Sequence, residues 1–172
     1  MAEGVCRVGV LGPLVLEREG RPVPLPSGRQ RSLLALLLMA GGAPLSRQAA
    51  GYALRRGEFE LDSVRFDALV ERARAEPDQA RTLLREALDL VRGEPLCDVP
   101  AERSLAQWRR ALEEKCLHAL VLRIEADLEA GAAGELVAEL ESLVAAHPFE
   151  ERPWAQLMLA LCLSPYAERV IT

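Results

Sequence analysis

The feature that most constrains the fold is a long stripe of apolar residues at helical spacing. It begins at Leu105, ends at Leu128 and contains neither proline nor glycine. This spacing predicts a single helix over residues 103–130, which Gly131 ends. At about 1.5 Å per residue the helix is roughly 42 Å long, enough to form the spine of the molecule. The stripe consists of Leu105, Trp108, Leu112, Cys116, Leu120, Ile124 and Leu128.

The sequence around this spine is helical in pattern from residue 62 onward, with two further apolar stripes before the spine and two after it. The segment 111–163 reads as helix, Gly131, helix, Pro148 and helix, as in a tetratricopeptide repeat. Stacked helix pairs expose a groove that binds peptides, helices or small ligands, although helices that only cover one another give the same spacing. The four stripes lie at residues 66–73, 83–91, 136–144 and 154–161.

The first 57 residues follow a different pattern, with short apolar runs separated by turn residues. Alternation over residues 5–11, followed by the runs 14–16 and 23–25, predicts a small antiparallel β meander. Residues 52–54 are a further strand candidate. This part of the chain is therefore expected to form a small sheet.

One helix is predicted within this N-terminal part. Ser27 followed three residues later by Gln30 forms a capping box, which opens a helix that continues through the leucine-rich residues 33–39. The predicted fold is therefore α+β. It consists of a head (residues 1–57), which is a β meander with one helix, and an all-α tetratricopeptide-like body (residues 58–172).

The charge of the chain is divided between these two parts. The net charge is −5; the head holds eight Arg against three Glu, a balance of +5, whereas the body has a balance of −10. This asymmetry favours a head that tolerates polyanions, although a generally arginine-rich surface explains it equally well. Four separated cysteines and two histidines have no metal-ligand spacing, so we expect reduced thiols and no metal or cofactor. No leader pattern and no membrane-spanning run is seen, and we expect a cytoplasmic protein.

Longer stretches of both parts resemble one family. The head sequence VGVLGPLVLEREGRPVPLPSGRQRSLLALLLMAGGAPLSRQ is similar to the start of the Streptomyces antibiotic regulatory protein family, which has an OmpR-like winged helix-turn-helix. The body sequences GYALRRGEFELDSVRFDALVERAR, ARTLLREALDLVRGEPLCDVP and LEEKCLHALVLRIEADLEAGAAGELVAELESLVAAHPFEERPWAQLMLAL resemble its bacterial transcriptional activator domain. The resemblance covers nearly the whole chain and implies a regulator of antibiotic biosynthesis genes.

The sequence departs from this family at APLSRQAAGYALRRG, residues 43–57. A helix begins at Ser46, but Gly51 follows after one turn. In the family this helix continues and leads to the recognition helix, so we expect about two helices to be missing, and the family pattern also breaks off early near the C-terminus. The remaining head would retain only sequence-blind phosphate contacts. The candidate residues are Arg29, Arg31, Arg47, Arg55 and Arg56.

The missing helices would also uncover the apolar face of residues 33–39. Such a face requires a cover, which could be the helical body, a partner protein or a second copy of the chain. The first functional hypothesis is therefore a regulator that acts mainly through protein contacts of its body. The partner would be a homodimer mate, a full-length relative or the transcription machinery, and DNA binding by this chain alone would be weak or absent.

A second hypothesis is a small-molecule-binding or accessory protein of an antibiotic pathway, with the helical groove as the site. Its candidate residues are Trp108, Cys116, His118 and Trp154, which core packing also explains. An enzyme is not expected, because the sequence shows no phosphate-binding loop, nucleophile elbow or metal cluster. The carboxylate pairs such as Glu113-Glu114 are typical of a solvated helix face.

Overall fold

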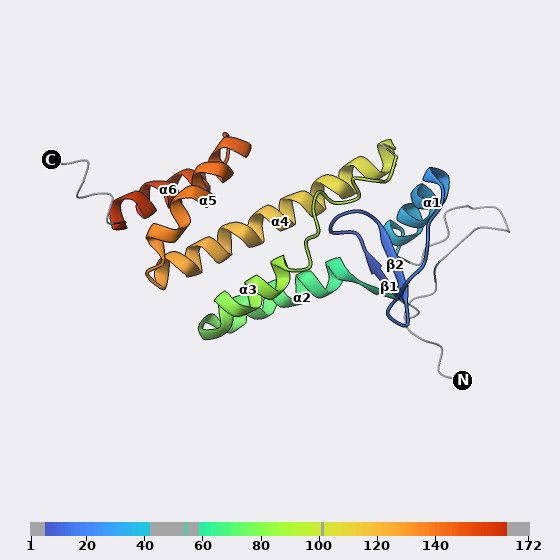
Figure 1. Cartoon of the computed structure of the whole chain (residues 1–172), viewed down its shortest axis with the longest axis horizontal. Helices are drawn as coiled ribbons and strands as arrows, with labels where there is room; N and C mark the ends of the chain where they lie inside the picture. Colours follow the sequence, from blue (N-terminus) through green and yellow to red (C-terminus); the bar gives the residue numbers. More distant parts are fainter. Residues whose placement is uncertain (1–5, 42–53, 55–58, 101, 165–172) are drawn as a thin grey trace.

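The computed structural model describes residues 6–41, 54, 59–100 and 102–164. A small sheet with one helix lies at one end of an elongated molecule, and the long helix α4 (Arg103–Glu129) runs away from it to a final pair of helices (Figure 1). The predicted helix over residues 103–130 is confirmed almost to the residue. The predicted α+β class is confirmed as well.

The sheet has four strands in the order β3-β2-β1-β4. Strands β1 (Cys6–Gly9), β2 (Val15–Arg18) and β3 (Arg21–Pro22) form the predicted antiparallel meander, with the third strand two residues earlier than expected. Strand β4 (Phe59–Leu61) pairs with β1 in parallel, from Cys6 opposite Phe59 to Val8 opposite Leu61. The sheet is therefore mixed, and the meander accounts for three of its four strands. A strand of three residues is too short to show alternation in the sequence.

Helix α1 (Gly28–Met39) begins where the capping box predicts, because the Ser27 hydroxyl accepts a hydrogen bond of 3.3 Å from the backbone N–H of Gln30. Its leucine-rich face packs toward the N-terminal part of α4, so Leu37 and Leu38 are buried while Leu33 and Met39 remain partly exposed. The body therefore covers much of the face that the sequence predicts to need a cover. Of the strand candidate at residues 52–54, only Leu54 is described, and it lies outside any strand.

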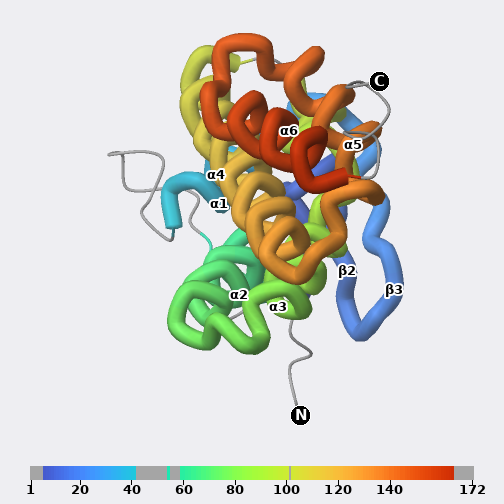
Figure 2. Tube along the Cα trace, turned by 90° about the vertical axis from the view of Figure 1, so that its left-hand side faces the viewer, coloured from blue at the N-terminus to red at the C-terminus, as the bar shows by residue number. Residues whose placement is uncertain are grey.

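The body contains the predicted helices. Helix α2 pairs with α3, α3 lies against α4, and α5 pairs with α6 (Figures 1 and 2). A 3₁₀ turn with Pro77 at its first position joins α2 to α3. The bounds are α2 (Asp62–Ala75), η1 (Pro77–Gln79), α3 (Ala80–Leu88), α5 (Ala133–Ala146) and α6 (Glu151–Leu163).

Two hydrophobic clusters form the core, and α4 contributes to both. The first cluster joins the sheet and α1 to α2, α3 and the N-terminal half of α4, for example through Leu105 and Leu112. The second joins Ile124 and Leu128 of α4 to α5 and α6. The head and the first helices of the body thus share one core, so the predicted division at residues 57 and 58 does not separate two hydrophobic cores.

Polar contacts around Asp62 fix the end of β1 to the start of α2. The Asp62 carboxylate accepts hydrogen bonds from the backbone N–H groups of Val10, at 2.8 Å, and Leu11, at 3.1 Å. It also pairs with the Arg92 guanidinium at 3.1 Å. Because Val10 and Leu11 are fully buried, these backbone donors have no access to water as an alternative partner.

Arg92 extends this connection to the loop between β1 and β2. Its backbone N–H donates to the Leu11 carbonyl at 2.7 Å, and its guanidinium donates to the Pro13 carbonyl at 3.0 Å. Glycine at position 12 permits this approach, because Gly12 has a φ of +147° and a Cβ there would lie 2.9 Å from the Arg92 Cβ. The close approach of Arg92 to the backbone thus explains the glycine that ends the GVLG stretch of the sequence.

A second set of contacts fixes the same loop to the segment after α3. Asp98 accepts a hydrogen bond of 2.7 Å from the backbone N–H of Leu14 and forms an ion pair with Arg31. The N–H of Leu96 donates to the Gly12 carbonyl at 2.7 Å. Arg109 of α4 then donates to the carbonyl of Leu96 at 2.9 Å. The loop before α4 is therefore held from both sides.

We predict that Asp62→Ala lowers the free energy of unfolding by about 2–4 kcal/mol, because two buried backbone donors and Arg92 lose their acceptor. Urea unfolding followed by circular dichroism measures this change. The control is Glu114→Ala, which breaks an exposed pair with Arg110 and should cost less than about 0.5 kcal/mol. Equal effects of the two substitutions would contradict the role given to Asp62.

Candidate interaction sites

The arginines predicted to contact phosphate do not form a common surface among the described residues. Arg29 is exposed on the first turn of α1. Arg31 is engaged inside the protein, because it pairs with Asp98 and donates to the Leu25 carbonyl at 3.1 Å. Arg47, Arg55 and Arg56 lie outside the described residues. Of the described candidates, Arg29 is therefore the one whose side chain has no internal partner.

The aromatic and cysteine candidates for the helical groove lie in different places. Trp108 and Cys116, both on α4, are half-buried against the first hydrophobic cluster. Trp154 lies on α6, is 45% exposed and donates from its indole N–H to the Pro148 carbonyl at 3.1 Å. The structure thus places Trp108 and Cys116 against the first cluster but Trp154 on the surface.

His118 and Cys116 differ in their surroundings, as their spacing of two residues on a helix requires. His118 contacts the Arg74 guanidinium at 2.7 Å, and burial together with the charges of Arg74 and Arg152 lowers its pKa. Burial, and then the negative charges of Asp62 and Glu113, raise the pKa of the Cys116 thiol to about 11. A thiol with this pKa stays protonated at neutral pH and is a weak nucleophile.

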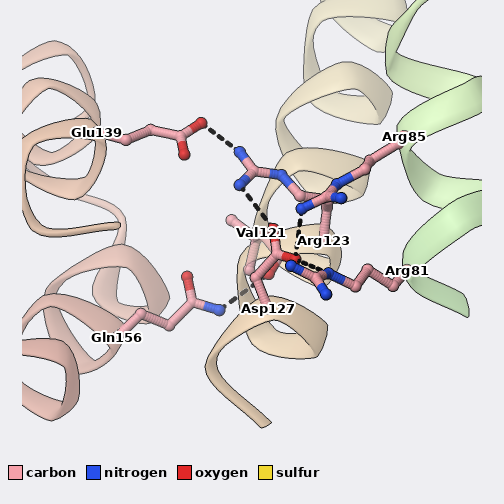
Figure 3. Close-up of polar contacts among 7 residues, drawn as sticks. All are labelled: Arg81, Arg85, Val121, Arg123, Asp127, Glu139 and Gln156. Atoms are coloured by element: carbon pink, nitrogen blue, oxygen red, sulfur yellow. Dashed lines mark hydrogen bonds and ion pairs between the residues drawn. The ribbon is translucent and has the colours of Figure 1, made fainter. Parts of the chain in front are cut away.

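A network of charged side chains joins three helices of the body (Figure 3). Asp127 of α4 is buried. Its carboxylate forms ion pairs with Arg85 at 2.9 Å, with Arg123 at 3.1 Å and with Arg81. The other side of the Arg123 guanidinium pairs with Glu139 of α5. The network therefore ties α3, α4 and α5 together at the point where the two hydrophobic clusters meet on α4.

The arginines keep Asp127 ionised despite its burial. Burial opposes the charged form, but the hydrogen bonds from Arg123 and Arg81 and the charge of Arg85 outweigh it, so the pKa of Asp127 is lower than its usual value of 3.8. Our sequence reasoning missed this network. A charged pair, Arg123 and Asp127, four residues apart and next to Ile124 and Leu128 of the apolar stripe, is the signal that could have revealed it.

A groove of about 440 Å³ lies between the C-terminal part of α4 and α6. Gln156 anchors α6 to α4 by donating to the Val121 carbonyl at 2.9 Å, and Arg152 pairs with Glu125 at 2.9 Å. The side-chain oxygen of Gln156 is buried and has no hydrogen-bond partner among the described residues. The groove is lined by Glu125, Leu128, Glu129, Arg152, Ala155, Gln156, Leu159 and Leu163.

Apolar side chains are exposed around this groove. Of the eleven large hydrophobic residues that the structure shows as exposed, six lie between residues 149 and 163. Met158 is 66% exposed and Leu163 is 60% exposed. Exposed apolar residues that gather on one element mark an interaction surface rather than the scattered exposure normal for a protein. The six are Phe149, Trp154, Met158, Leu159, Leu161 and Leu163.

A larger open cavity of about 900 Å³ lies between the sheet and α2. Its walls are mainly apolar and include Val8, Leu38 and Leu61, while Arg65 and Glu60 lie at the rim. Within the described part of the chain, no His, Cys, Asp and Glu side chains gather to hold a metal ion. No described helix is both long and apolar enough to cross a bilayer.

A small sheet-and-helix head that shares its core with a tetratricopeptide-like helical body defines the class of this protein. Residues 61–168 match the bacterial transcriptional activator domain family, and the chain belongs to that family. The resemblance to the Streptomyces antibiotic regulatory proteins is thereby confirmed. The family and the relatives described next are transcriptional regulators rather than enzymes, as the sequence predicts.

The chain is 36% identical to the regulatory protein AfsR of Streptomyces coelicolor over 202 positions, which cover 92% of this chain and 20% of AfsR. It is 40% identical to the regulatory protein DnrI of Streptomyces peucetius over 116 positions, which cover 64% of this chain and 43% of DnrI. It therefore spans less than half of either relative. A solved structure of Mycobacterium tuberculosis EmbR in complex with a low-affinity phosphopeptide superposes with a TM-score of 0.74 at 27% identity, covering 93% of this chain and 55% of EmbR.

The lengths of these alignments differ in an informative way. Ninety-two per cent of 172 residues is about 158, so about 44 of the 202 positions aligned with AfsR have no residue in this chain. Sixty-four per cent is about 110, so the alignment with DnrI leaves only about 6 of 116 positions unmatched. The alignment with AfsR, which covers nearly the whole chain, thus leaves many more positions unmatched than the alignment with DnrI.

We predict that Asp127→Ala lowers the free energy of unfolding by about 3–5 kcal/mol, because Arg123 is left buried with a lost partner. Asp67→Ala, which removes a half-exposed pair with Lys115, is the control and should cost less than about 1 kcal/mol. The contribution of the Asp127 charge is present above the usual carboxyl pKa of 3.8 and is lost as the pH falls through its lowered pKa. Urea unfolding at several pH values tests both points. If Asp127→Asn loses unfolding free energy at acid pH as steeply as the unchanged chain does, the second point is contradicted.

We predict that Cys116 reacts more slowly with a thiol reagent at pH 8 than the exposed Cys97 and Cys162, because its pKa is about 11. Mass spectrometry of the chain after timed alkylation with iodoacetamide identifies which cysteines are modified. Denatured protein, in which all the thiols are equally accessible, provides the control. Modification of Cys116 at the same rate as Cys97 in the folded chain would contradict its burial in the first cluster.

Proposed function

We propose that this chain is a regulator of transcription in secondary metabolism that acts mainly through protein contacts of its helical body and not by reading DNA sequence. Membership in the bacterial transcriptional activator domain family supports the regulatory part of the proposal. The similarity to AfsR and DnrI, both regulatory proteins of Streptomyces, supports the biological setting and a place in the cytoplasm, where bacterial transcription occurs.

The observation that carries the proposal is the short connection between α1 and β4. Helix α1 ends at Met39 and β4 begins at Phe59, which leaves the nineteen residues 40–58. A helix-turn-helix requires two helices of about 11 residues and a turn of about 3–4, or roughly 25 residues in all. The connection is too short to hold both helices of this unit. About 44 of the positions aligned with AfsR have no residue in this chain, which supports a shortened chain relative to AfsR.

The charges support weak and unspecific contact with DNA. Sequence readout requires side chains that reach base edges in the major groove, usually from an inserted helix. Arginines on a surface give only phosphate contacts, which are sensitive to salt and blind to sequence. Arg31 is already occupied by Asp98, and the head of charge +5 is attached to a body of charge −10. The acidic body repels the same phosphates that the head attracts.

The body, by contrast, retains its packing and an exposed apolar surface. The second hydrophobic cluster and the Asp127 network hold α4 and α5 in place, and α6 presents Met158 and Leu163 to solvent. This surface supports a protein partner, either another regulator or a second copy of the chain. EmbR, with which this fold superposes, has been captured with a peptide partner, although this chain spans 55% of its length.

The cavity beside the sheet favours a second candidate function, the binding of a small molecule. Its volume of about 900 Å³ falls in the range of ligand sites, and its walls combine apolar residues such as Val8 and Leu61 with charged groups at the rim. A thermal-shift screen with antibiotic intermediates tests this candidate. A shift that disappears in Ala68→Trp, which fills the cavity, would support it, and no shift with any compound would remove it.

We predict that selection from a random duplex library recovers no preferred sequence for this chain, because no described segment presents a reading helix. Its affinity for any duplex, measured by fluorescence anisotropy, should be the same for different sequences and should fall steeply as salt rises from 50 to 200 mM. Arg29→Ala should weaken this residual binding without changing its lack of preference. A preference of about a thousandfold for one sequence, as specific regulators show, would overturn the proposal.

A further inference from the structure

We infer that the groove between α4 and α6 is the docking site for an amphipathic helix of a partner protein that carries basic residues beside its apolar stripe. The inference rests on the proposed function, since it names the site and the chemistry of the protein contact.

Helix α6 is apolar on three sides. One side, which includes Leu157 and Ala160, is buried against α5 in the second cluster. A second side lines the groove with Ala155, Leu159 and Leu163. The third carries the exposed residues Trp154, Met158 and Leu161, which are spaced at i, i+4 and i+7. A helix that is apolar all round is normally buried, whereas the described residues leave two apolar sides of α6 uncovered.

The groove has the features that hold a helix. Its floor includes the buried Leu128 of α4, and its wall is formed by residues of α6 four apart, which matches the spacing at which a docked helix inserts its apolar side chains. Gln156 also lines the groove, and its hydrogen bond to the Val121 carbonyl holds this wall against α4.

The charges around the groove determine the kind of helix. Arg152, the one basic residue in the lining, is neutralised by its pair with Glu125. Glu129 remains exposed in the lining with no ion pair to any described residue, and the exposed Glu150 and Glu151 stand beside Arg152 without one as well. The surroundings of the groove are therefore negative, and a basic partner is favoured.

The same charges argue against a second copy of this chain as the occupant. Each copy brings a body of charge −10, so bringing two bodies together through this acidic end meets electrostatic repulsion. A helix with lysine or arginine beside its apolar stripe meets attraction instead. We therefore assign the groove to a basic amphipathic helix from a different protein.

The experiment uses the full chain and two synthetic amphipathic peptides with the same leucine stripe, one flanked by lysine and the other by glutamate. Fluorescence anisotropy should show binding of the lysine peptide and at least tenfold weaker binding of the glutamate peptide. Leu159→Glu in the groove should reduce binding of the lysine peptide at least tenfold, and Glu129→Gln should reduce both its affinity and its salt dependence. The matched control is Val64→Glu on α2, an exposed apolar residue outside the groove, which should leave binding unchanged.

Several results would overturn the inference. Equal binding of the two peptides would remove the charge argument, and the absence of binding, with circular dichroism showing a folded chain, would remove the site. A dimer in solution that Leu159→Glu converts to a monomer would assign the groove to a second copy. Binding that appears only in Val170→Asp would assign it to the C-terminal residues of the chain itself. Sequence-specific DNA binding would overturn the proposed function but leave the peptide result standing, so the two failures are distinguishable.

Discussion

The carboxylate of Asp62 is the contact on which the arrangement of this molecule depends most. It begins the first helix of the body and, at the same time, satisfies the buried backbone donors of Val10 and Leu11 at the end of the first strand. Arg92 neutralises it and reaches the Pro13 carbonyl. Because buried donors must find partners, the sheet can end at this point only if the body is in place. A head of few strands therefore gains its order from the helices that follow it.

Helix α4 plays the corresponding part in the body. It contributes Leu105 and Leu112 to the first cluster and Ile124 and Leu128 to the second. A single helix therefore fixes the positions of the two clusters relative to each other. The Asp127 network lies where the two clusters meet. Buried charges add little net stability, yet they tolerate only one alignment of the helices that supply them, because any shift leaves a charge unpaired. We regard the network as fixing the alignment of α3, α4 and α5, and thus the groove at α6.

These two features explain how a chain with a short head can remain a folded regulator. In the function that we propose, the connection between α1 and β4 is too short for both helices of a reading unit, and the head is held by Asp62, Arg92 and Asp98. The exposed apolar surface lies at the opposite end of α4 (Figure 1). In the function that we propose, the end of the molecule that contacts other proteins is intact, whereas the end that would contact DNA is shortened.

The sequence by itself determined the helices and their order. Local signals sufficed for them: the stripe from Leu105 to Leu128, the cap at Ser27 and the break at Gly131 all act within a few residues of the chain. Only the tertiary structure decided the contacts between distant residues. The parallel strand at Phe59, the capture of Arg31 by Asp98 and the gathering of three arginines around Asp127 join residues 42 to 67 positions apart, with Arg123 the one local member. Such pairs leave no period in a single sequence, because what brings them together is the packing of whole helices.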